Sequence, residues 1–365
     1  MGQLRTRAGK TARRRIGEEK QRIGGLESWR TGEKIIRRYP AEWEKQACVW
    51  LAWPHNEKEW GKGKLEKLRE FYKKLISTIL QFQDVNLILA DEVMLKEVET
   101  IHKLSLQRTK QQLKKIIIPN NDIWIRDYGP FFVVRVHHGA PLLLDFEFNA
   151  WGGKFPPWDL DNNVSKQITL YTGNYSESYP VVLEGGAIDF NGNSIAVTTE
   201  ECLLNKNRNP KITKLQMENI IKSVFNLEKI IWLKRGLKGD HTDGHVDNVA
   251  RFIDTKKILI NKPIVKEDNY LLEIKNGLKN YDVHIEEVPL PVIKQNRKRL
   301  PASYLNFIFV NGGIIVPTFD CETDKMTINI FKKLFPKRKI IGIDCSLLIQ
   351  EGGGLHCMTK QEAAI

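Results

Sequence analysis

The stretch KIIIPNNDIWIRDYGPFFVVRV (residues 115–136) holds two β-rich runs, and the polar loop between them carries Trp124 and Asp127. Val, Ile and Phe favour strands, whereas Gly and Pro mark turns. Further β-rich runs lie at residues 85–90, 142–148, 194–199, 257–260, 307–310 and 314–317. Amphipathic patterns typical of helices lie between them, near residues 64–82, 91–103, 212–226, 267–278 and 323–334. Because strands and helices alternate, the sequence predicts an α/β fold.

The composition predicts a globular, cytoplasmic protein. At 365 residues and 41% hydrophobic content, the chain can bury a large core. No stretch approaches the roughly 18 consecutive apolar residues of a membrane span, and the amino terminus has no apolar signal-peptide core. The five cysteines lack CxxC spacing, so the pattern indicates neither a disulfide framework nor a zinc ribbon.

The net charge of +13 is concentrated at the amino terminus. Residues 1–40 hold nine Arg and three Lys against four Glu, which leaves a net charge of +5 to the other 325 residues. We interpret residues 1–38 as a basic, disordered leader and residues 39–365 as one catalytic domain. The alternative interpretations of the leader are a nucleic-acid-binding arm, a poorly formed transit peptide and translated upstream sequence. A non-catalytic nucleic-acid-binding protein led by this arm is the rival hypothesis to an enzyme.

Two acidic motifs follow the first loop. In LEGGAIDF (183–190), Glu184 comes directly after an apolar run, where two glycines would let the backbone approach a ligand. In HTDGHVDNVARF (241–252), alternation along a strand edge would place Asp243, His245 and Asp247 on one side. A helical metal pair of His241 and His245 is disfavoured by Gly244, and a solvated acidic loop stays open as the alternative.

The last motif is EGGGLHCMT (351–359), which contains Cys357. It lacks the GK[ST] ending of a phosphate-binding loop, so we expect its glycines to bring the backbone close to a flat substrate. A lone cysteine is more often buried and inert than catalytic. This thiol therefore needs partners elsewhere in the chain.

The spacing of the motifs supplies such partners. The intervals between successive members of the set are 57, 61, 61 and 51 residues, for Asp127, Glu184, His245, Asn306 and Cys357. Each residue lies beside a β-rich run. A ring of repeated units, each sending one loop to a shared axis, would produce this period.

Several motifs together resemble the agmatine deiminase branch of the guanidine-modifying superfamily, which includes a bacterial peptidylarginine deiminase. They are PAEWEKQACVWLAWP (40–54), NDIWIRDYGP (121–130), FNAWGG (148–153), LEGGAIDF, CLLNKNRNP (202–210), DGHVDN, SYLNF and GGGLHC. The resemblance implies the pentein fold, a five-bladed α/β propeller with pseudo-fivefold symmetry. It also implies a site on the axis that needs no metal or organic cofactor.

The resemblance assigns a role to each site residue. Cys357 would be the nucleophile, His245 the general acid and base, and Glu184 the carboxylate that holds the imidazole. The substrate-binding residues would be Trp124, Asp127, Asp247 and Asn306, with the two aspartates gripping the guanidinium.

The implied reaction is deimination of a small cationic guanidine, with agmatine converted to N-carbamoylputrescine as the first choice. The chain has GGGLHC and HTDGHVD where the best-defined agmatine deiminases have GGGNIHC and DTNGHVD. The motifs do not fix the contacts to the substrate tail, so another guanidine such as peptidyl arginine is the alternative. A metal-dependent hydrolase is the third hypothesis, and the sequence leaves a homo-oligomer open.

Overall fold

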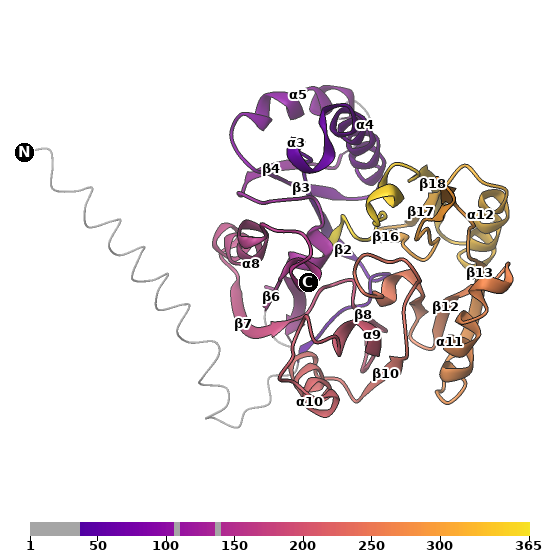
Figure 1. Ribbon diagram of the computed structural model, residues 1–365. Coiled ribbons are helices and arrows are strands. Elements are labelled where there is room, and N and C mark those ends of the chain that lie inside the picture. Colours follow the sequence, from indigo (N-terminus) through magenta and orange to yellow (C-terminus); the bar gives the residue numbers. More distant parts are fainter. Residues whose placement is uncertain (1–36, 106–109, 136–139) are drawn as a thin grey trace, which may run out of the picture.

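The computed structural model describes residues 37–105, 110–135 and 140–365 (Figure 1). The leader predicted for residues 1–38 therefore lies almost wholly outside the described residues. Its last two residues form strand β1 (Arg37–Arg38), which pairs antiparallel with β5 (Phe131–Arg135). Two residues that the sequence assigned to the leader therefore belong to a strand of the described structure.

Four units along the described chain share one topology, in which an antiparallel strand pair is followed by a helix and a third, parallel strand. The first unit comprises β5, β6 (Leu142–Glu147), α8 (Asp159–Thr172) and β7 (Tyr175–Val182). The second comprises β8 (Ile188–Phe190), β9 (Ile195–Thr199), α10 (Lys214–Phe225) and β10 (Lys229–Leu233). The third comprises β11 (Ala250–Asp254), β12 (Lys257–Lys262), α11 (Leu271–Leu278) and β13 (His284–Pro289). The fourth comprises β16 (Ile308–Val310), β17 (Gly313–Thr318), α12 (Thr323–Leu334) and β18 (Lys339–Asp344).

A fifth unit joins the two ends of the described chain. The C-terminal strand β19 (Lys360–Ala363) pairs antiparallel with β2 (Gln46–Ala52), which leads through α4 (Lys62–Ile79) to the parallel strand β3 (Asp84–Leu89). Helix α5 (Met94–Ser105) then leads to a further parallel strand, β4 (Leu113–Ile117). In Figure 1 the five sheets surround a central region, with their helices toward the outside.

Short elements lie in the connections within and between the units. They are α3 (Glu57–Trp60), α6 (Ile125–Tyr128), α7 (Ala150–Gly153), α9 (Glu200–Leu203), η1 (Val246–Asn248), η2 (Lys266–Asp268), β14 (Lys294–Gln295), β15 (Lys298–Arg299) and η3 (Leu348–Glu351). No helix within the described ranges is long and apolar enough to cross a membrane.

Local sequence explains the crossover helices, as α10 illustrates. Thr213 and Gln216 form a capping box at its start, and Asn226 ends it in the left-handed conformation with φ of 53°. Met217 and Ile221 lie four residues apart and are fully buried against the sheet of the second unit. A parallel third strand requires such a crossover, so each helix is also the connection that builds its unit.

The predicted α/β class is confirmed, and most β-rich runs and amphipathic stretches fall on strands and helices. The sequence missed α8 and most of the third strands, including β7 and β13, whose side chains are largely exposed or half-buried. Such strands lack the continuous apolar run on which the prediction relied.

Arg251, on β11, ties several units together from a fully buried position. Its guanidinium donates to Glu42 Oε2 at 2.6 Å and to Asp189 Oδ1 at 2.9 Å. It also donates to the carbonyl oxygens of Leu305 and Phe307. Two buried carboxylates from different units therefore depend on one cation.

We expect Arg251→Met to destabilise the fold strongly. Removing the cation leaves Asp189 without its ion pair and Glu42 with His356 and one backbone N–H as its remaining donors, and breaking a buried ion pair typically costs about 3–5 kcal/mol. Urea unfolding measures this loss. Lys256→Met is the matched control, because its ion pair with Asp282 is exposed, and it should change stability little. Equal stability of the Arg251 variant and the wild type would contradict this account.

Candidate active site

The five residues with the regular spacing occupy equivalent places in the five units. Each lies in the loop that enters the first strand of an antiparallel pair: Asp127 before β5, Glu184 before β8, His245 before β11, Asn306 before β16 and Cys357 before β19. The near-constant period therefore follows from a repeated unit. The contacts described below show that these loops meet.

The Cys357 thiol lies against the Asn306 amide. Asn306 Nδ2 is 3.2 Å from Cys357 Sγ and also donates to Asn248 Oδ1, while its Oδ1 accepts from the backbone N–H of His356 at 2.8 Å. We expected Asn306 among the substrate-binding residues. In the structure its amide is instead occupied with the thiol and with neighbouring protein groups.

Asp127 is buried and receives hydrogen bonds only from neutral donors. It sits in the short helix α6, where its Oδ1 accepts from the backbone N–H of Gly186 at 2.8 Å and its Oδ2 accepts from Trp151 Nε1 at 3.0 Å. Burial, ahead of the attraction of His245, raises the pKa of this carboxyl. His245 Nδ1, at 3.8 Å from Oδ1, lies beyond hydrogen-bonding distance.

Asp247 is equally buried, but one of its oxygens has a strong partner. Its Oδ2 lies 2.8 Å from His356 Nδ1, whereas its Oδ1 has no hydrogen-bond partner. Burial would raise the pKa of Asp247, but the hydrogen bond from His356 and the positive charges of His356, His245 and Arg251 together outweigh it, so the pKa is lowered. The site thus contains an ionised carboxylate with one free, buried oxygen.

His245 lies between the carboxylates with neither ring nitrogen hydrogen-bonded. Burial would lower its pKa, but the negative charge of Asp127 and the contact with Cys202 outweigh burial and raise it well above the usual value. A protonated imidazole is therefore expected in the free protein. Such a group can donate a proton to a leaving atom.

Glu184 is near the imidazole but is bonded to a different residue. Its Oε1 accepts from Arg208 Nε at 2.6 Å, both side chains are fully buried, and its Oε2 is without a partner. The sequence assigned Glu184 to hold His245, and no direct hydrogen bond joins the two in the described structure. The nearest ligand atoms of Glu184, Cys202 and His245 lie within 4.8 Å of one another.

This last trio is the only group of the described residues arranged to hold a metal ion. Arg208, bonded to Glu184 and to Asp243 Oδ2, places a fixed positive charge directly against it. That charge opposes a cation at the same position. The residues therefore suit an organic reaction better than a metal centre.

The alternation predicted for residues 241–248 is wrong. The segment forms turns and the short helix η1, because Asp243 and Gly244 adopt φ of 64° and 90°. The Asp243 side chain turns toward Lys154 and Arg208, while His245 and Asp247 are buried. Only two of the three side chains expected on one side therefore reach the site.

The glycines of the motifs make room for the protein's own side chains. A Cβ at Gly353 would overlap the Trp124 ring, and one at Gly354 would overlap the Asn306 side chain. A Cβ at Gly186 would lie 2.5 Å from His245 Nδ1. We expected these glycines to let the backbone approach a substrate, whereas in the structure they let the loops of the site pack against each other.

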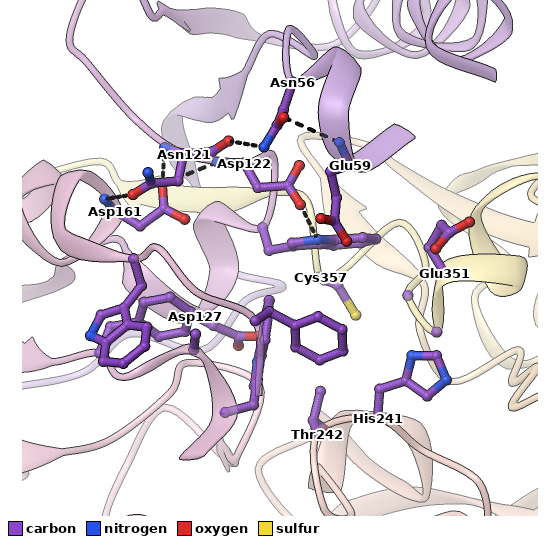
Figure 2. Close-up of a pocket in the computed structure, with 18 of the residues that line it drawn as sticks. Asn56, Glu59, Asn121, Asp122, Asp127, Asp161, His241, Thr242, Glu351 and Cys357 are labelled. Atoms are coloured by element: carbon purple, nitrogen blue, oxygen red, sulfur yellow. Dashed lines mark hydrogen bonds between the residues drawn. The ribbon is translucent and has the colours of Figure 1, made fainter. Parts of the chain in front are cut away.

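A pocket opens above the thiol (Figure 2). The Cys357 sulfur points into the space between Asp127, His241 and Glu351. The pocket is lined by five acidic side chains and, among the described residues that line it, no Lys or Arg; the acids are Glu59, Asp122, Asp127, Asp161 and Glu351. Burial raises the pKa of Asp122 to about 6.

Aromatic rings form much of the rest of the pocket wall. Trp124 lines the pocket, with its Nε1 donating to Asp122 Oδ2 at 3.0 Å, and Trp60 donates to Asp122 Oδ1 at the same distance. An acidic, aromatic pocket suits a flat organic cation, because both carboxylates and π faces attract positive charge.

Sequence reasoning missed three residues that hold the site together. Glu42, Arg208 and His356 all lie within motifs quoted above, yet each contacts its partner across a long separation in the chain, up to 314 residues for His356 and Glu42. The motifs marked these positions as family features. Nothing in the local pattern indicated their partners.

The chain is similar to known proteins. The model of the Porphyromonas-type peptidyl-arginine deiminase family matches residues 38–362. The agmatine deiminase of Pseudomonas syringae pv. tomato is 33% identical over 89% of this chain and 95% of its own length.

Two solved structures are also similar. A variant of the C. jejuni agmatine deiminase with substrate bound is 34% identical, covers 90% of this chain and 96% of its own, and has a TM-score of 0.82. The agmatine deiminase of Enterococcus faecalis is 28% identical, with 94% and 98% coverage and a TM-score of 0.82.

We predict that Asp247→Asn speeds alkylation of Cys357 by iodoacetamide in the absence of substrate. Burial, followed by the charges of Asp247 and Asp127, raises the thiol pKa well above its usual value. Removing one negative charge favours the thiolate, so the pKa falls, and each unit gives about tenfold more thiolate at neutral pH. Peptide mass spectrometry locates the modified cysteine.

The exposed Asp282→Asn serves as the control and should leave the alkylation rate unchanged. In the wild type, the rate of Cys357 alkylation should keep rising with pH above the ordinary pKa of a cysteine thiol. A slower reaction in the Asp247 variant would show that the carboxylate does not suppress the thiolate.

Proposed function

Because the chain belongs to the Porphyromonas-type peptidyl-arginine deiminase family, we propose that it hydrolyses agmatine to N-carbamoylputrescine and ammonia. The observation that carries this proposal is the buried thiol near two buried carboxylates with incomplete hydrogen bonding: Asp127 accepts only from neutral donors, and Asp247 Oδ1 has no partner. A guanidinium would donate charged hydrogen bonds to both carboxylates.

We propose that residues 39–365 form one catalytic domain with the five-bladed propeller arrangement. The five repeated units, each contributing one loop to the site, support this arrangement, and the continuous family match supports a single domain. A loop from each unit would then hold one site residue near the pseudo-fivefold axis.

The substrate itself would activate the nucleophile. In the free protein, burial and the two aspartates suppress the Cys357 thiolate. A guanidinium bound to Asp127 and Asp247 would neutralise those charges, so the thiolate would form only with substrate present. Trp124, on the pocket wall, would flank the flat cation.

The thiolate would then attack the guanidinium carbon to give a tetrahedral adduct. Protonated His245 would donate its proton to one amino group, the carbon–nitrogen bond would break, and ammonia would leave. An S-alkylthiouronium would remain on Cys357. Asn306, 3.2 Å from the sulfur, would steady the thiol through these changes.

Water would complete the reaction. Neutral His245 would take one proton from the attacking water, and the carbon–sulfur bond would break to release the ureido product and the thiolate. The second proton would leave with ammonia as ammonium. Overall, guanidinium and water give the ureido product and ammonium.

The pocket favours agmatine over arginine. Agmatine ends in an ammonium group, whereas arginine adds a carboxylate at the same end of the molecule. Glu59 lines the pocket beyond the thiol, Glu351 lines it as well but forms an ion pair with Lys64, and no Lys or Arg is among the described lining residues. A substrate carboxylate would meet like charge there.

We expect purified protein to form ureido product from agmatine faster than from arginine or an arginine-ended peptide. Glu59→Gln should lower kcat/KM for agmatine by up to about fivefold, the range for an exposed ion pair. The ratio of kcat/KM for agmatine to kcat/KM for arginine should therefore fall in this variant. Glu57→Gln, an exposed acid on the same helix but outside the pocket lining, is the matched control.

Preferred turnover of the arginine-ended peptide would contradict agmatine as the substrate and favour the peptidyl-arginine alternative. Absence of ureido product from all three guanidines would contradict the enzymatic function.

We also predict that Asp127 and Asp247 bind one shared cation. Asp127→Asn and Asp247→Asn should each reduce kcat/KM, and the double variant should lose much less than the product of the two single losses. Thermal unfolding checks the fold, which should hold or gain stability because repulsion in the free site is relieved. Independent, multiplicative losses would show that the two carboxylates act on separate groups.

A further inference from the structure

His356, the residue before Cys357, is held between two buried carboxylates. Its Nδ1 lies 2.8 Å from Asp247 Oδ2 and its Nε2 lies 2.9 Å from Glu42 Oε2. Ionised carboxylates accept hydrogen bonds but cannot donate them, so both ring nitrogens act as donors. The residue is only 2% exposed, so water offers no substitute for either bond.

Glu42 is itself fixed on its far side. Its Oε2 also accepts from Arg251 Nη2 at 2.6 Å, and its Oε1 accepts from the backbone N–H of Phe309 at 3.1 Å. Burial would raise the pKa of Glu42, but Arg251 and His356 outweigh it and hold the pKa far below its usual range. Glu42 is therefore a permanent, immobile acceptor for His356.

The bond to Asp247 has a direct consequence for the site. Because His356 engages Oδ2, rotation of the carboxylate is restrained and Oδ1 is left without a partner. The backbone N–H of His356 also donates to Asn306 Oδ1, which ties the same residue to the loop that contacts the thiol. One rigid link therefore spans Asp247 and Cys357.

Resting on the proposed guanidine chemistry, we propose that Glu42 and His356 form a positioning clamp that fixes the orientation and charge of Asp247 before the substrate binds. We call these two residues the Glu42–His356 clamp. A preorganised carboxylate loses no freedom when the cation arrives, and small displacements from a productive geometry are costly. His356 acts through Asp247 and need not touch the substrate.

Two substitutions of His356 separate its two bonds. The amide nitrogen of Asn occupies a place similar to Nδ1, whereas that of Gln occupies a place similar to Nε2. His356→Asn can therefore keep the bond to Asp247, and His356→Gln can keep the bond to Glu42. If His356 had a purely structural role, substrate binding would not depend on whether the bond to Asp247 or the bond to Glu42 is kept.

The test measures agmatine binding by calorimetry in a Cys357→Ala background, where no turnover occurs. We expect His356→Gln to weaken binding by roughly tenfold to a hundredfold, the range for a hydrogen bond to a charged group. His356→Asn should stay within about threefold of its parent, since the bond to Asp247 is retained. His284→Gln, at an exposed histidine, is the matched control and should leave the affinity unchanged.

Equal losses in the two His356 variants, or undiminished affinity in His356→Gln, would overturn the proposal. Crystal structures of both variants test whether the Glu42–His356 clamp orients Asp247, even if the protein neither binds nor converts a guanidine. Asp247 should keep its orientation in His356→Asn and rotate in His356→Gln, and an unmoved Asp247 in both would refute the clamp. Absence of turnover by the wild type would instead refute the proposed function.

Discussion

Buried carboxylates with incomplete hydrogen bonding are the constraint on which this site depends. Asp127 receives only neutral hydrogen bonds, and one oxygen of Asp247 receives none. Burying such groups is costly, so the fold must hold them firmly. Three other buried acids have cationic partners, since Arg208 is bonded to Glu184 and Arg251 to Asp189 and Glu42. The carboxylates of Asp127 and Asp247 therefore stay available to bind a cationic substrate.

The repeated unit explains how these charges come together. Each of the five units sends the loop before its first antiparallel strand toward the same place, so residues far apart in the chain can meet. Close packing of the loops requires glycine where one backbone faces another side chain, as Gly353 does with Trp124 and Gly186 with His245. The motif glycines are therefore part of the scaffold for the charges.

The sequence predicted the parts of the fold and site that leave a local pattern. Apolar runs marked β3 and β12, and the regular spacing placed Asp127 and Cys357 in equivalent loops. Exposed third strands such as β7 left no such pattern. Asp243 was misplaced because left-handed backbone conformations interrupt the expected alternation. The role of His356 was hidden because its two partners come from distant segments, which only the folded chain brings together.

The central claim is that a guanidinium held by the aspartates becomes covalently attached to Cys357 during turnover. Rapid acid quenching of the protein with agmatine, followed by mass spectrometry of intact protein and peptides, tests it most directly. The account predicts an adduct with the mass of agmatine less ammonia on the peptide that contains Cys357, absent in Cys357→Ser. Ureido product formed without any adduct on Cys357, or an adduct on Cys202 or another cysteine, would contradict it.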